Sequence, residues 1–285
     1  MTAFSDAAPL LQSLKPSPRM PVLFMGHGSP MNAIEDNPWR RGWQNLGTEL
    51  QARGAAQPQL ILCISAHWLT RGGWQITGMA RPKTIHDFGG FPQALFDQQY
   101  PAPGAPAVAA SLAQELQSPA TGAALGVDAD VWGLDHGTWS VLKPMFPQAS
   151  IPVLQLSMDY SRPPNEHFAL GQQLQGLRER GVLIVGSGNI VHNLRAARRD
   201  ASVMQAYDWA QEFDAAVQTQ IEKGDLATLA NFQALGSMAQ MAHPTHEHYL
   251  PLLYAAGAVR VGETPRFMNT GFQSASISMR SVVWG

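Results

Sequence analysis

The chain has 285 residues, a formal net charge of −2 at pH 7, a hydrophobic fraction of 45% and a charged fraction of 14%. Such a composition supports a sizeable apolar core and argues against intrinsic disorder. The small net charge provides no general field that would attract nucleic acid or an anionic membrane. We therefore expect neither nucleic acid nor a membrane as a partner.

Cys63 is the single cysteine, so the chain cannot form an internal disulfide bond. A free cysteine inside an apolar run fits a reducing compartment. The N-terminus lacks the basic and apolar regions of a secretory signal, and no apolar run reaches the roughly 20 residues that span a bilayer. These features predict a cytoplasmic protein and leave a homo-oligomer open.

Residues 1–19 are predicted to form a loose lead-in, and residues 20–285 a single domain. Apolar runs predict strands and helical spacing predicts helices, in alternation along this domain. The alternation is typical of an α/β fold with a mostly parallel central sheet and helices on both faces. The predicted strands are 21–26, 59–65, 74–79, 151–158, 181–187 and 274–284, and the predicted helices are 38–50, 105–117, 138–146, 164–180, 205–224 and 246–257.

A long segment, residues 81–106, is rich in proline and glycine and has no clear periodicity. Loops of this length inside a compact domain are usually functional or disordered. The aromatic residues of this one favour an ordered loop that covers a site.

Three of the nine histidines directly follow predicted buried strands or lie a few residues beyond one. They are His27, His67 and His192. Because the carboxyl ends of parallel strands open onto one crevice, we expect these imidazoles to converge. Converging neutral imidazoles suit Zn, Cu, Fe or Ni, which predicts a mononuclear metal site at the strand ends.

The chain offers a further histidine cluster near its C-terminus, His243-Pro244-Thr245-His246-Glu247-His248. Thr245 is a candidate helix cap, which would place His246, Glu247 and His248 in the first turn of a helix. Successive helical positions point about 100° apart, so these three cannot all face one metal. The sequence leaves open which of Glu247 and His248 faces inward.

The remaining histidines stand in other contexts. His136 lies in a predicted turn before the helix that Thr138 would cap, and an uncoordinated imidazole near a metal is suited to general acid/base work. We expect Trp68, His86 and Phe88 to shape an aromatic substrate pocket, and His167 to be a surface residue.

The sequence matches neither a nucleotide-binding motif nor the motif around a hydrolase nucleophile. Gly186-Ser187-Gly188 lacks the Gly-Lys-Ser/Thr ending of a phosphate-binding loop, and the third glycine of a dinucleotide fingerprint would fall at Val191. Ser29 and Ser187 lack the Gly-x-Ser-x-Gly context of a hydrolase nucleophile. We interpret residues 186–188 as a turn that delivers His192 into the crevice.

Six ordered motifs together resemble one family, the class III (LigB-type) extradiol ring-cleaving dioxygenases, in their DOPA 4,5-dioxygenase branch. The resemblance runs from about residue 19 to the C-terminus. The motifs are Gly26-His27-Gly28-Ser29-Pro30, Ser65-Ala66-His67-Trp68, residues 86–92, Asp135-His136-Gly137, residues 188–193 and Glu247-His248-Tyr249-Leu250-Pro251.

The resemblance implies an enzyme that opens a catechol ring with O₂ at a non-haem metal, Zn(II) or Fe(II). By motif, His27 and His67 match metal ligands, and His192 and His248 match the histidines that complete a zinc site in this branch. His136 matches a pocket histidine suited to proton transfer. In the protocatechuate-cleaving branch a glutamate replaces one histidine ligand, and a histidine near the position of His192 serves as acid/base.

Coordination chemistry leaves open how many histidines bind the metal during turnover. Four protein ligands close a tetrahedral site, whereas a dioxygenase must keep positions open for substrate and O₂. Either His192 leaves the metal during turnover, or a four-histidine zinc form is a resting state. A zinc-dependent hydrolase or amidase using the same site, and a non-catalytic member that binds an aromatic ligand, are the other functions that the sequence allows.

Overall fold

The structure is a computed structural model, and it describes residues 14–198, 200 and 205–285. Its centre is an eight-stranded sheet in the order β4-β3-β5-β2-β6-β1-β10-β7. The four middle strands, β5, β2, β6 and β1, are mutually parallel. The bounds are β1 (Val22–Gly26), β2 (Leu60–Thr70), β3 (Gln75–Thr77), β4 (Gly126–Asp128), β5 (Val153–Asp159), β6 (Val182–Gly188), β7 (Pro265–Met268) and β10 (Ser281–Trp284).

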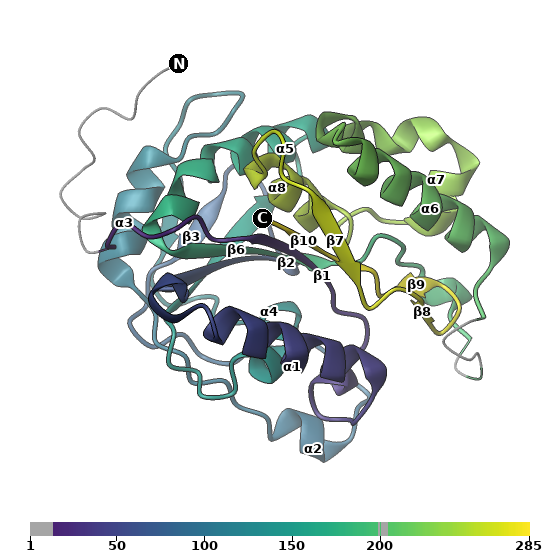
Figure 1. Ribbon diagram of the computed structural model, residues 1–285, viewed down its shortest axis with the longest axis horizontal. Helices are drawn as coiled ribbons and strands as arrows, with labels where there is room; N and C mark the ends of the chain where they lie inside the picture. Colours follow the sequence, from purple (N-terminus) through teal and green to yellow (C-terminus); the bar gives the residue numbers. More distant parts are fainter. Residues whose placement is uncertain (1–13, 199, 201–204) are drawn as a thin grey trace.

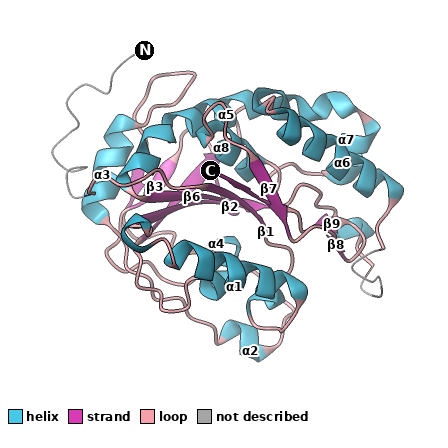
Figure 2. Ribbon diagram, viewed as in Figure 1, coloured by secondary structure: helices cyan, strands magenta, loops and turns pink. Residues whose placement is uncertain are grey.

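Helices cover both faces of this sheet, as the sequence predicts (Figures 1 and 2). In Figure 1, α1 and α4 lie on one face, and α5, α6, α7 and α8 lie on the other. The helices are α1 (Pro38–Gln51), α2 (Gln93–Phe96), α3 (Pro106–Glu115), α4 (His136–Met145), α5 (Pro164–Gln173), α6 (Asp208–Lys223), α7 (Ser237–Ala242) and α8 (Leu250–Ala258), with 3-10 helices at Pro30–Ala33, Gly54–Ala56, Gln175–Arg180, Leu194–Ala196 and Leu226–Leu235.

Strand β2 shows why the two faces carry separate apolar cores. Leu60, Leu62 and Ile64 belong to the core shared with α5 and α8, whereas Ile61 and Cys63 belong to the core shared with α1 and α4. Alternate side chains of a strand point to opposite faces, so a strand buried on both sides is apolar at every position. The continuous apolar runs in the sequence therefore predict these central strands well.

The C-terminal strand prediction is wrong in its extent. Residues 274–284 do not form one strand; they contribute to β9 (Ile277–Ser278), which pairs with β8 (Phe272–Gln273), and to β10. Ser274 and Ala275 adopt positive φ angles of 54° and 64°, which an extended strand cannot accommodate. β10 then joins the large sheet antiparallel to β1.

The predicted lead-in is anchored where the structure describes it, and residues 1–13 lie outside the described range. Leu14 is buried in the core on the α5 and α8 face. The backbone N–H of Ser17 donates to the carbonyl of Glu179 over 2.8 Å. None of the helices in the described ranges is long and apolar enough to cross a membrane.

His167 is fully buried in α5, so the expectation of a surface residue is wrong. Trp74 Nε1 donates to the Tyr254 hydroxyl over 2.6 Å, and that hydroxyl lies 2.7 Å from His167 Nδ1. Since the indole can only donate, the hydroxyl proton is free to go to His167. Burial lowers the pKa of His167 to about 4.

We expect His167 to make the fold sensitive to acid. Below its ordinary pKa of 6.5 the unfolded chain takes up a proton that the folded chain refuses until about pH 4, so stability falls across that window by about 3 kcal/mol. Urea unfolding at pH 7 and pH 4.5 measures the loss. His167→Gln does not titrate, so its loss should be smaller; an equal loss in both proteins would contradict the assignment.

Candidate metal centre

The three strands that lead to His27, His67 and His192 are neighbours in the sheet, in the order β2-β6-β1. His27 directly follows β1, His67 lies near the end of β2, and His192 lies four residues beyond β6. Because these strands are parallel, their carboxyl ends deliver the side chains to the same edge of the sheet.

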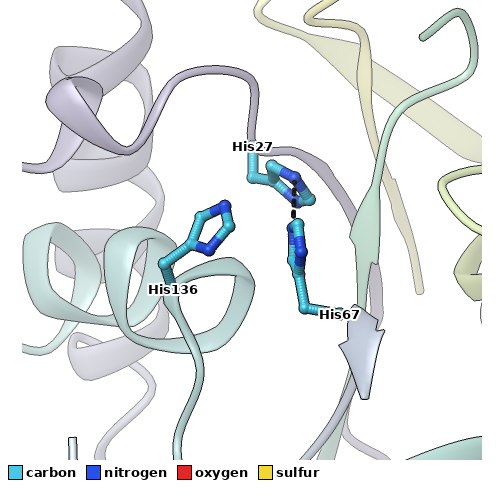
Figure 3. Close-up of side chains that lie close together, drawn as sticks. All are labelled: His27, His67 and His136. Atoms are coloured by element: carbon cyan, nitrogen blue, oxygen red, sulfur yellow. Dashed lines mark hydrogen bonds between the residues drawn. The ribbon is translucent and has the colours of Figure 1, made fainter. Parts of the chain in front are cut away.

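Five histidines meet at this edge and are called the histidine cluster: His27, His67, His136, His192 and His248. The Nε2 atoms of His27 and His67 lie 3.3 Å apart, and Figure 3 shows these two rings beside that of His136. The ring of His248 lies 5.2 Å from that of His27 and 5.0 Å from that of His67, and it stacks on His192 at 3.5 Å. Five imidazoles from distant parts of the chain therefore come together.

Ser187 fixes the protonation of His27. Its Oγ lies 2.5 Å from the carbonyl of Gly137, to which it donates its only proton, and 3.1 Å from His27 Nδ1. The hydroxyl therefore accepts from a protonated Nδ1, which leaves a lone pair on Nε2. Gly28 supports the position of His27, because the chain turns there with a φ of +56°, a conformation that glycine adopts without strain.

The interpretation of residues 186–188 as a turn is wrong. They are the last three residues of β6, and Ser187 pairs with Met25 on one side and Ser65 on the other. The strand continues because both neighbouring strands extend the hydrogen-bond ladder to this point. Ser187 is consequently held on a rigid element beneath His27.

His136 is the first residue of α4, which begins two residues earlier than predicted. Asp135 caps the helix by accepting the N–H of Thr138 over 3.1 Å, a role that aspartate fills well. The next residue, Gly137, lies so close to the Ser65 side chain and the His67 ring that a Cβ atom has no room. The cap and this close approach together set His136 beside His67, with ring centroids 3.8 Å apart.

Asp87, from the long loop predicted to be functional, lies behind two of the histidines. Its Oδ1 is 3.0 Å from His136 Nδ1, and its Oδ2 is 3.5 Å from His67 Nδ1. Burial raises the pKa of Asp87, but the contact with the His136 ring, the proximity of His67 and the backbone N–H of His136 outweigh that effect and bring the pKa to about 2. The carboxylate is therefore ionised at neutral pH.

His248 faces the cluster, and Glu247 lies beside it. The His248 ring lies near those of His27 and His67, while Glu247 Oε1 lies 3.2 Å from His248 Nδ1. Ligand atoms of Glu247, His192 and His248 all lie within 4.8 Å of one another. Neither residue is in a helical first turn as predicted, because α8 begins only at Leu250. A carboxylate on Nδ1 leaves Nε2 of His248 as the nitrogen with a free lone pair.

Four members of the cluster, His27, His67, His192 and His248, are held in their uncharged form. Burial, followed by the neighbouring histidines, lowers the pKa values of His27, His67 and His248 well below 6.5. Burial and the proximity of His136 lower the pKa of His192 to about 4. At neutral pH these four imidazoles are therefore neutral, which is the form that binds metals.

The donor set fits a divalent transition metal. The Nδ1 atoms of His27 and His67 are turned toward Ser187 and Asp87, and their Nε2 atoms face each other across 3.3 Å. Two imidazole nitrogens on one zinc lie about 3.4 Å apart, given Zn–N distances of about 2.1 Å and a tetrahedral angle. The observed separation therefore matches that of two nitrogens on one cation.

Of the three residues expected to shape an aromatic pocket, only Phe88 contacts the histidine cluster. Phe88 packs against the His136 ring at 5.5 Å. His86 Nε2 instead lies 2.9 Å from the carbonyl of Gln98, and Trp68 stacks on Trp132 at 5.8 Å. Among the ring contacts of the described residues, neither His86 nor Trp68 reaches the cluster.

Sequence reasoning missed two residues that contact it, Asp87 and Ser187. Both lie in motifs named above, Asp87 between His86 and Phe88, and Ser187 between two glycines. The usable signal was the need of each ligand histidine for a second hydrogen-bond partner on its other nitrogen.

Residues 21–283 match the model of one protein family, described as the catalytic LigB subunit of aromatic ring-opening dioxygenase. The chain belongs to this family. It is 45% identical over 275 residues to a 4,5-DOPA dioxygenase extradiol of Escherichia coli (strain K12), covering 94% of this chain and 96% of that protein. A 4,5-DOPA dioxygenase extradiol of Beta vulgaris is 32% identical over 263 residues, with coverages of 91% and 94%.

A crystal structure of an uncharacterized Escherichia coli K12 protein superposes with a TM-score of 0.78. It shares 39% sequence identity and covers 94% of this chain and 100% of its own. Family, relatives and fold agree with the resemblance that the histidine motifs carry. They identify the chain as an extradiol aromatic ring-opening dioxygenase.

We expect Ser187→Ala to weaken metal binding about 10- to 100-fold, the usual cost of losing the partner of a ligand histidine. The variant removes the acceptor that keeps the proton of His27 on Nδ1. Competition with a chromogenic chelator measures the affinity for zinc. Ser140→Ala is the matched control, since Ser140 is also buried but its Oγ has no hydrogen-bond partner among the described residues. Equal affinities in the two variants would refute the expectation.

Proposed function

We propose that this protein is a metal-dependent extradiol dioxygenase that opens a catechol ring with O₂, acting on a DOPA-like substrate at the 4,5 position. The names of the relatives support the substrate class. The observation that carries the metal dependence is the pair of facing Nε2 atoms of His27 and His67, whose Nδ1 atoms are both turned to other partners.

His27, His67, His192 and His248 would hold the metal, either Fe(II) or Zn(II). When bound, the metal supplies Lewis-acid stabilisation of a deprotonated catechol and, as iron, the redox chemistry that O₂ requires. Imidazole ligands suit both metals. The ring-opening chemistry of the family favours iron as the metal of the active form. It also favours a dioxygenase over a zinc-dependent hydrolase.

His192 is the ligand best suited to leave the site. Its ring lies flat against His248, and among the described residues it has no ring hydrogen bond or ion pair of the kind that His27, His67 and His248 make. Its departure would open a position for substrate and would free an imidazole as a second proton carrier. A four-histidine zinc form would then be a resting state.

His136 would act as general acid/base. It stands beside His67 at 3.8 Å between ring centroids and is buried. It would take a proton from a catechol hydroxyl and later return one to the ring-opened product. Phe88, which packs on its edge, would form part of the wall against the aromatic ring of the substrate. His86, whose ring lies 5.8 Å from that of Phe88, would support that wall.

The activity can be tested directly. Protein loaded with Fe(II) under anaerobic conditions should turn DOPA or a simple catechol yellow when air is admitted, as the ring-opened product forms. Absorbance and mass spectrometry follow the product, and metal-free protein is the control. If a broad panel of catechols gives no ring-opened product, while the zinc form cleaves an ester or amide, the hydrolase alternative replaces this proposal.

His136→Gln should lower kcat by about 10²- to 10⁴-fold, the usual contribution of a positioned acid/base. The bound iron should stay at the wild-type level, because His136 is not among the proposed ligands. His248→Ala, in contrast, should lose the metal. Metal analysis and steady-state kinetics of both variants distinguish the two roles, and loss of iron from His136→Gln would show that His136 is a ligand.

A further inference from the structure

One carboxylate contacts two histidines that have different proposed roles. Asp87 reaches His67 Nδ1 with Oδ2 at 3.5 Å and His136 Nδ1 with Oδ1 at 3.0 Å. Oδ1 also accepts the backbone N–H of His136 over 2.9 Å. The side chain of Asp87 is 17% exposed, so solvent competes little for these contacts.

His136 has no other acceptor for its Nδ1. That atom is buried, and among the described residues it has no partner in good hydrogen-bond geometry; its ion-pair contact with Asp87 is the nearest acceptor. A buried N–H without an acceptor is costly. The proton on Nδ1, and hence the free lone pair on Nε2, depends on the carboxylate.

The loop that carries Asp87 is fastened by the two residues that directly precede it. The N–H of Ile85 donates to the Leu134 carbonyl over 2.8 Å, and Trp139 Nε1 donates to the Ile85 carbonyl over 2.9 Å. His86 Nε2 lies 2.9 Å from the carbonyl of Gln98 within the loop. These bonds tie the loop to α4 and the residues before it, so Asp87 and His136 are held in one rigid frame.

We infer that Asp87 is a positioning residue that sets the same tautomer in His67 and His136, with protons on both Nδ1 atoms and both Nε2 atoms free. The assignment of His67 as ligand and His136 as acid/base rests on the proposed function, but the tautomers do not. One side chain thereby aligns the metal site with the proton-transfer group. Carboxylates behind ligand histidines commonly serve this purpose.

The test compares Asp87→Asn and Asp87→Glu with a control in the same loop, Asp97→Asn. Asp97 is exposed and bonded to Gln93, so its loss should change nothing at the cluster. Long-range ¹H–¹⁵N NMR of the metal-free protein reports which imidazole nitrogen of each histidine is protonated. Spectra of His67→Gln and His136→Gln assign the signals, and chelator competition measures zinc affinity.

We expect Asp87→Asn to move at least one of His67 and His136 away from the Nδ1-protonated form and to weaken zinc binding about 10- to 100-fold. An amide has one oxygen and can serve one imidazole at most. Asp87→Glu keeps the carboxylate and should preserve the Nδ1 protons of both rings. Wild-type tautomers and zinc affinity in Asp87→Asn would overturn the inference.

A second variant covers the case in which Asp87→Asn does not fold. Asp87→Ala leaves room for a small anion, so added formate should restore the Nδ1 protons and zinc affinity, whereas chloride at the same concentration should not. Equal spectra and affinities in the two salts would also overturn the inference. None of these measurements depends on ring cleavage. They therefore still test the role of Asp87 if the protein opens no catechol.

Discussion

The active edge of this protein depends on two imidazole nitrogens that face each other. His27 and His67 present Nε2 atoms 3.3 Å apart, and a partner lies near the Nδ1 atom of each ring. If both Nδ1 atoms carry the proton, two lone pairs meet at this distance and a cation between them is favoured. The sheet, the capped helix α4 and the long loop all serve to hold this arrangement.

Three histidines of the cluster, His27, His67 and His248, each have a partner from a different kind of element. Ser187 lies on the central strand β6, Asp87 on the loop between β3 and α2, and Glu247 in the turn before α8. The strand is held by its hydrogen-bond ladder, and the loop by its bonds to α4 and the residues before it. The histidine cluster is thus supported by separate parts of the fold.

Much of the fold and of the cluster could be predicted because local sequence carried the signal. The apolar runs of β1, β2 and β6 mark central parallel strands, and a histidine at or after the end of each is enough to place His27, His67 and His192 at one edge. The prediction failed where local rules compete: Asp135 rather than Thr138 caps α4, and the Gly-Ser-Gly segment continues β6. Neighbouring strands, which are invisible in a local pattern, decided the second case.

The sequence by itself determined the α/β class, the strand ends that carry histidines and the family, because these rest on periodicity and on motifs of adjacent residues. Only the tertiary structure decided that His248 faces the other histidines with Glu247 beside it, and that Asp87 contacts both His67 and His136. Such contacts join residues far apart in the sequence: Asp87 and His136 are separated by 49 positions, and His27 and Ser187 by 160. Side-chain direction and partner choice are set by packing across the fold, and no local pattern encodes them.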